Sequence, residues 1–170
     1  MLIGRQKFVI ANWKMYFSYN QAVAWCTMYA KELISLSSQS SIVICPSYEA
    51  ISVLQIVYND TSIALGAQNC SEFTAGAYTG QVMAQSLKEL GARYCIVGHS
   101  EIRKAFHDSN EVFEKKLRQL LEHQIVPIFC IGESLHAYQH DATFTVLEEQ
   151  LQSLKKISTE YADRALTFLI

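Results

Sequence analysis

Three polar residues follow an apolar run near the middle of the chain, at Gly98-His99-Ser100-Glu101. The preceding run, residues 94–97, has the length and composition of a buried strand. We therefore expect His99 just past the carboxyl end of a parallel strand and at the amino end of a helix, where α/β proteins bind ligands. The positive end of a helix dipole disfavours a charged imidazole. The ring should then be neutral and able to donate a hydrogen bond to a substrate oxygen.

Other strand ends also carry polar side chains. They are Asn12 and Lys14, Gln68 and Asn69, and Cys130 and Glu133. An ammonium group, an amide and a neutral imidazole that face one cavity suit an anionic, oxygen-rich substrate. Together they would stabilise negative charge that develops on two adjacent oxygens.

Metal and acyl-transfer chemistry have weaker signals. His99-x-Glu101 matches half of a zinc deaminase signature, but no P-C-x-x-C accompanies it. His136 and His140 have the spacing of one helix face, yet the chain contains no H-E-x-x-H. The nucleophile elbow G-x-S-x-G is also absent. A structural role for a histidine that follows a strand remains the alternative to catalysis.

Strands and helices are expected to alternate along the whole chain. The apolar runs predict six strands, at residues 7–11, 42–45, 63–67, 94–97, 125–131 and 166–170. Helical periodicity and capping residues predict helices at residues 20–36, 47–58, 82–90, 101–106, 108–123 and 135–157, the last with a break near residue 140. Such alternation predicts a parallel sheet with right-handed crossovers. The spacing approaches the roughly 30 residues per strand–helix pair of a (β/α)₈ barrel. A doubly wound open sheet is the competitor, but its glycine-rich phosphate motifs are missing.

Length and composition fit one α/β domain over residues 1–170. Half of the residues are apolar, the net charge is −2, and no run of lysines or arginines occurs. Nucleic acid and anionic membranes are therefore not expected as partners, and no apolar stretch is long enough for a membrane span. The five cysteines form no C-x-x-C pair, so we expect reduced, buried thiols in a cytoplasmic protein.

Four motifs, in order along the chain, resemble the triosephosphate isomerase family. Phe8–Met15 (FVIANWKM) is similar to its first strand, and Gly66–Cys70 (GAQNC) with Thr79-Gly80 is similar to its third strand and dimer loop. Ile96–Glu101 (IVGHSE) is similar to the fourth strand, and Pro127–Glu133 (PIFCIGE) to the fifth. The resemblance implies a TIM barrel, here incomplete and ending in the sixth strand.

The resemblance also implies an activity, the interconversion of dihydroxyacetone phosphate and glyceraldehyde 3-phosphate through an enediolate, in glycolysis and gluconeogenesis. Asn12 and Lys14 would bind the substrate, and Lys14 would supply electrostatic stabilisation. His99 would act as the neutral electrophile that polarises the substrate carbonyl, because in this family the pKa of the corresponding histidine is lowered by a helix N-terminus. Glu101 would support that centre and orient Lys14, and Cys130 would pack behind the site. No cofactor or metal is implied.

A homodimer is implied by the same resemblance. The loop Ser71–Gln81, with Thr79 and Gly80, would reach into a second subunit. The family usually pairs a glutamate after T-G with an arginine after S-E, whereas this chain has Gln81 and Ile102. Both partners are changed together, so no charge is left unpaired.

The general base of the family is a glutamate just after the sixth strand, and this chain ends at Ile170, inside that strand. The resemblance therefore implies that the 170 residues alone are an inactive fragment of the isomerase. The alternative from the sequence is a truncated, non-catalytic paralogue that acts as a binding or assembly partner.

Overall fold

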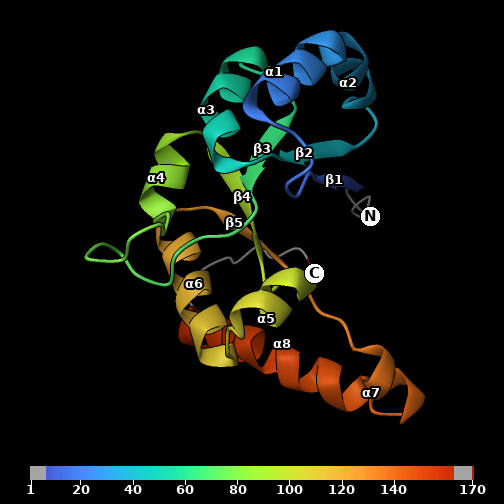
Figure 1. The fold of residues 1–170 in the computed structure, drawn as a ribbon, viewed down its shortest axis with the longest axis vertical. Helices are drawn as coiled ribbons and strands as arrows, with labels where there is room; N and C mark the ends of the chain where they lie inside the picture. Colours follow the sequence, from blue (N-terminus) through green and yellow to red (C-terminus); the bar gives the residue numbers. More distant parts are fainter. Residues whose placement is uncertain (1–6, 163–169) are drawn as a thin grey trace. The chain divides into compact units, whose positions relative to one another are not determined.

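A computed structural model describes residues 7–162 and residue 170, and its strands alternate with helices as expected (Figure 1). Five strands form one sheet in the order β1-β2-β3-β4-β5. β1 pairs with β2, β2 with β3, and β3 with β4, each in parallel. The strands are β1 (Phe8–Asn12), β2 (Ser41–Cys45), β3 (Ala64–Ala67), β4 (Ala92–Val97) and β5 (Val126–Phe129). The strand expected at residues 166–170 lies outside the described residues, except for its last position.

Helices connect the strands. They are α1 (Tyr19–Met28), α2 (Ala30–Leu36), α3 (Tyr48–Val57), α4 (Ala84–Glu89), α5 (Ser100–Phe106), α6 (Asn110–Glu122), α7 (Leu135–Gln139) and α8 (Thr143–Glu160). The break expected near residue 140 is confirmed, because α7 ends at Gln139 and α8 begins at Thr143. The helix expected over 20–36 is instead divided at Tyr29, which the periodicity did not indicate.

The contacts of the chain divide it into two compact units. The first comprises residues 1–68 and 86–95, and the second residues 69–85 and 96–170. Strand β4 contributes to both, since residues 92–95 belong to the first and residues 96–97 to the second. The single domain expected from the sequence stays a prediction.

In the first unit, α1 and α3 pack against each other and α3 packs on β3. The core side chains come from these helices and from β2 and β3, where the burial is continuous, as in a parallel strand covered on both faces. Gly66 is required by a close approach of strands, because a Cβ there would lie 2.6 Å from the Cys45 Sγ. The largest of these side chains are Ile44, Ile51, Leu54 and Leu65.

In the second unit, α6 packs on β5 and on α8. Phe113 of α6 meets Phe129 of β5 edge-to-face, with ring centroids 6.3 Å apart. Leu154 and Ile157 of α8 are also buried, in keeping with its contacts to α6.

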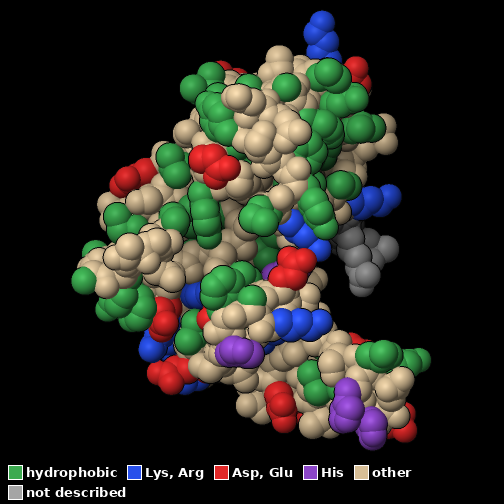
Figure 2. All heavy atoms as spheres, viewed as in Figure 1, with side chains coloured by type: hydrophobic (Ala, Val, Ile, Leu, Met, Phe, Trp, Pro, Cys, Tyr) green, Lys and Arg blue, Asp and Glu red, His purple; other side chains and the backbone are tan. Residues whose placement is uncertain are grey.

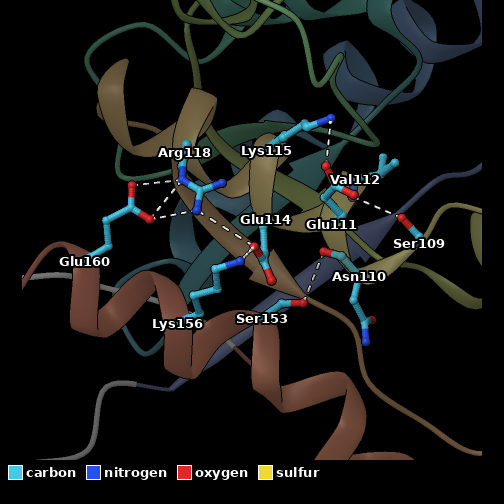
Figure 3. A network of polar contacts seen from close by, with 10 residues as sticks. All are labelled: Ser109, Asn110, Glu111, Val112, Glu114, Lys115, Arg118, Ser153, Lys156 and Glu160. Atoms are coloured by element: carbon cyan, nitrogen blue, oxygen red, sulfur yellow. Dashed lines mark hydrogen bonds and ion pairs between the residues drawn. The ribbon is translucent and has the colours of Figure 1, made fainter.

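Ion pairs fasten α8 to α6 along the same contact (Figure 3). The carboxylate of Glu114, 11% exposed, lies 2.6 Å from the Lys156 Nζ and 3.8 Å from the Arg118 guanidinium. Arg118 also holds the Glu160 carboxylate by two guanidinium nitrogens, and this lowers the pKa of Glu160. Glu114 is buried but its partner Lys156 is 62% exposed, and Glu160 is 42% exposed, so water screens one end of these pairs and they align the two helices more than they add stability.

α6 begins at Asn110, two residues after the start that the sequence predicts. Asp108 and Glu111 match a capping box, but Ser109 is the N-cap and its Oγ accepts a hydrogen bond from the Val112 N–H. Asp108 instead accepts from the Lys116 Nζ at 2.6 Å, and both side chains are largely buried. The carboxylate is drawn away from the cap because Lys116 needs a counter-charge.

Cys26, Cys45, Cys70 and Cys95 are buried, Cys130 is half-buried, and none of the five is in a disulfide. None of the described helices is long and apolar enough to span a membrane. Among residues 7–162 and 170, no three His, Cys, Asp or Glu side chains are grouped so that they could hold a metal ion. Figure 2 shows hydrophobic side chains exposed over α1 and α3, and histidines over α7.

Candidate functional site

His99 is the N-cap of α5 and follows the carboxyl end of β4, as the sequence predicts. Its Nδ1 accepts a hydrogen bond from the Glu101 backbone N–H at 3.3 Å. A backbone N–H can only donate, so Nδ1 must carry a lone pair there and the proton of a neutral ring lies on Nε2. The imidazole therefore has a hydrogen-bond donor that points away from its own backbone.

A second contact at the same nitrogen favours a proton on Nδ1 instead of a lone pair. The Glu101 Oε2 lies 3.4 Å from the His99 Nδ1, which suits a proton on Nδ1. The Glu101 side chain is 58% exposed, so water solvates its charge, whereas the backbone N–H is fixed in the first turn of the helix. The backbone hydrogen bond therefore sets the tautomer.

A cavity of about 350 Å³ lies beside His99 in the second unit. Its wall is formed by the segments that follow β4 and β5. Burial raises the pKa of the Cys130 thiol, and the nearby Arg103 guanidinium opposes this rise. The thiol is thus kept protonated at neutral pH, in keeping with a packing role. The lining residues are Gly98, His99, Ser100, Arg103, Cys130, Ile131, Gly132 and Glu133.

The segment after β5 is held from a distant helix. Gln150 of α8 accepts a hydrogen bond from the Gly132 N–H and donates one to the Gly132 carbonyl, both at 2.9 Å. This pair of bonds fixes the backbone that carries Glu133 into the cavity wall. Nothing in the sequence near Gln150 indicated this contact, because it joins positions 18 residues apart.

Asn12 and Lys14 lie together in the first unit, at and just after the carboxyl end of β1. Lys14 has a left-handed backbone with φ of 51°, which is unfavourable for a residue with a side chain. The Asn12 Oδ1 accepts from the Lys14 N–H at 3.1 Å, and the Gln68 Nε2 donates to the Lys14 carbonyl at 2.8 Å. Gln68, which the sequence offered only as a polar strand end, holds this turn.

The predicted site residues thus form two pairs. The structure brings Asn12 to Lys14, and His99 to Glu101, but each pair lies in a different compact unit. That the two pairs face one cavity stays a prediction. It is supported by the position of each pair after the carboxyl end of a strand.

The loop expected to reach a second subunit is closed at its base. The Ser71 N–H donates to the Val82 carbonyl at 2.8 Å. Within the loop, the Phe73 and Tyr78 rings stack with centroids 3.7 Å apart. Residues 74–81, which include Thr79, are exposed, and Gly80 has φ of 83°. The loop therefore projects a pre-shaped tip.

Known proteins match the chain over nearly all of its length. The family model described as triosephosphate isomerase matches residues 7–166. Curated triosephosphate isomerases of Dictyoglomus turgidum and Nitrosomonas europaea are 38% and 39% identical to it, over 92% and 89% of this chain. The chain spans only 64% and 60% of these two relatives, respectively.

A solved structure confirms the fold class. The crystal structure of triosephosphate isomerase from Bartonella henselae matches with a TM-score of 0.80 and 29% identity, over 87% of this chain and 61% of that one. The five-stranded sheet with its helices is thus an incomplete TIM barrel. On the strength of the family match and of these relatives, the chain belongs to the triosephosphate isomerase family.

Proposed function

We propose that the chain carries part of the active site of a triosephosphate isomerase, which interconverts dihydroxyacetone phosphate and glyceraldehyde 3-phosphate through an enediolate. The observation that carries the proposal is the hydrogen bond from the Glu101 N–H to the His99 Nδ1. It leaves the Nε2 proton available to polarise the substrate carbonyl and to shuttle protons between its two oxygens.

The other residues complete the electrostatics of the site. The Lys14 ammonium stabilises the negative charge of the enediolate and of the phosphate, and Asn12 fixes the substrate and the Lys14 turn. Glu101 orients Lys14 and supports the histidine. The reaction needs no metal or cofactor, because the proton transfers use side chains only.

A base must remove the substrate proton, and the family places it after the sixth strand. We therefore propose that residues 1–170 do not catalyse by themselves. The complete enzyme would be a cytoplasmic homodimer of glycolysis and gluconeogenesis, with the loop Ser71–Gln81 at the subunit contact.

The test restores a complete barrel. Residues 1–170 are fused to the remaining carboxyl-terminal segment of the Dictyoglomus turgidum relative, and isomerisation of glyceraldehyde 3-phosphate is measured. The fusion protein should be active, and residues 1–170 alone should not. His99→Asn should reduce kcat by roughly 10²–10⁴-fold.

His107→Asn is the matched control, because His107 is exposed and its left-handed backbone accepts asparagine. It should leave kcat within about twofold, as expected for a surface change. The isomerase would be rejected if the folded fusion protein is inactive, or if His99→Asn and His107→Asn have the same kcat. Either result would favour the alternative, a non-catalytic paralogue that acts as a binding or assembly partner.

A further inference from the structure

Arg103 of α5 bridges the ends of two neighbouring strands. Its Nε donates to the Gly98 carbonyl at 2.7 Å, and its Nη2 donates to the Cys130 carbonyl at 3.2 Å. The first carbonyl follows β4 and the second follows β5. One planar guanidinium therefore satisfies two backbone acceptors that would otherwise lie at the rim of the cavity.

The guanidinium is itself held by packing. Its Cζ lies 4.2 Å from the centroid of the Phe113 ring and 5.8 Å from that of Phe129. Burial lowers the pKa of Arg103, while the thiol of Cys130 and the carboxylate of Asp108 oppose this. Such a fixed, half-buried group can set the position of the backbone around it.

His99 is the residue whose geometry depends on these bonds. Gly98, whose carbonyl Arg103 holds, directly precedes His99 and has φ of 73°. The Arg103 N–H also donates to the His99 carbonyl at 3.0 Å. This second bond comes from the backbone of residue 103 and would form with any side chain there, so the guanidinium acts on His99 through the Gly98 carbonyl, which belongs to the peptide bond just before His99. That bond holds the start of α5 where the His99 Nδ1 meets the Glu101 N–H.

The residue at position 98 is matched to this arrangement. A Cβ on Gly98 would lie 2.7 Å from the Arg103 Nη2 and 3.3 Å from the Cys130 carbonyl. Only glycine therefore leaves room for the guanidinium between the two strand ends. The segment after β5 has its own second attachment through Gln150, so the loss of Arg103 should loosen the His99 side most.

We propose that Arg103 is a positioning residue for the candidate catalytic histidine: its guanidinium ties the carbonyls of Gly98 and Cys130 together and thereby holds His99 in the tautomer with Nε2 protonated. The inference rests on the proposed function for the use of that tautomer. The effect of Arg103 on the position and tautomer of the His99 ring can be measured without any activity assay.

The experiment uses the 170-residue chain labelled with ¹⁵N, with His99→Asn to assign the ring. Two signals are followed: the ¹⁵N shifts of the His99 ring, which report the tautomer, and hydrogen exchange at the Glu101 amide. Arg103→Lys keeps the charge but loses the planar fork, and Arg103→Met loses both. Arg93→Lys, on an exposed position of β4, is the matched control.

Arg103→Lys should speed exchange at Glu101 about tenfold, and Arg103→Met more, as the hydrogen bond opens. The two ring ¹⁵N shifts should move toward each other as the tautomers mix, while Arg93→Lys changes neither signal. Signals equal to the control in both variants would overturn the proposal. A collapse of the whole spectrum in Arg103→Lys, β1–β3 included, would overturn it too, since the role would then be global packing.

These outcomes are separable from those of the isomerase test. If the fusion protein is inactive but the His99 signals of the 170-residue chain depend on Arg103, the function is rejected and the positioning role is kept. If the fusion protein is active but those signals do not depend on Arg103, the positioning role is rejected and the function is kept.

Discussion

Lys14 shows at the scale of one residue how a site can require an unfavourable backbone. A left-handed conformation costs a residue with a side chain roughly 1–2 kcal/mol. Here Asn12 accepts from the Lys14 N–H and Gln68 donates to its carbonyl, so both backbone groups are satisfied. The same Gln68 amide donates to the Cys45 carbonyl at 3.1 Å. One side chain thereby ties the turn after β1 to the end of β2.

Gln68→Met tests this attachment. The substitution keeps the length of the side chain but removes the donor, so the carbonyls of Lys14 and Cys45 lose a partner in a half-buried place. We expect the free energy of unfolding of the chain to fall by about 1–3 kcal/mol. Gln152→Met, on an exposed position of α8, is the control and should change it little. If chemical denaturation shows the same loss of unfolding free energy for Gln68→Met and Gln152→Met, Gln68 does not stabilise the turn in this way.

At the scale of secondary-structure elements, two neighbouring lysines join α6 to the segment after β3 in the second unit, and they differ strongly in solvent exposure. The Lys116 side chain is only 6% exposed, and its ammonium joins Asp108 and the Asn69 Oδ1. The neighbouring Lys115 is 42% exposed and pairs with Glu72 and Glu111, which raise its pKa. Both lysines fasten α6 to the segment after β3, but only the first is shielded from water.

Lys116→Met should therefore be costly, because it removes the ammonium that the largely buried Asp108 carboxylate binds at 2.6 Å. We expect a loss of about 3 kcal/mol in the free energy of unfolding, measured by urea denaturation. Lys115→Met provides the matched control on the same helix, and its effect should be clearly smaller because the pair is solvated. The burial argument fails if the two substitutions cost the same.

At the scale of the whole molecule, the proposed homodimer depends on the loop after β3. The exposed tip at residues 74–81 is stiffened by the Phe73–Tyr78 stack and by the bond that closes the loop base. A pre-shaped tip loses little conformational entropy on binding. The altered positions Gln81 and Ile102 remove an ion pair usual in the family, so the interface of this protein would depend more on shape than on charge.

Thr79→Arg should disrupt that contact in the fusion protein, because a charge would be buried at the interface. Sedimentation velocity should show a dimer for the parent and a monomer for the variant at micromolar concentration. Gln152→Arg adds the same charge on an exposed part of α8 and should stay dimeric. A parent protein that sediments as a monomer would remove the dimer from the proposal.

Much of this structure was predictable because the signals are local. Apolar runs and helix caps depend on residues within a few positions of each other, and five of the six expected strands are found with ends shifted by one or two residues. The sixth falls on residues 163–169, which are not described. Capping was less certain, since Ser109 and Asp108 are both good caps and only the need of Lys116 for a counter-charge decides between them.

The sequence by itself determined the family, the alternation of strands and helices, and the residue types at the strand ends, with His99 at the amino end of a helix. Only the tertiary structure decided what holds those residues. Arg103 bonds a carbonyl 27 residues away, and Gln68 bonds one 54 residues away. Each of these bonds joins a side-chain N–H to a backbone carbonyl that the fold brings near it, and a carbonyl has no residue-specific signature in the sequence.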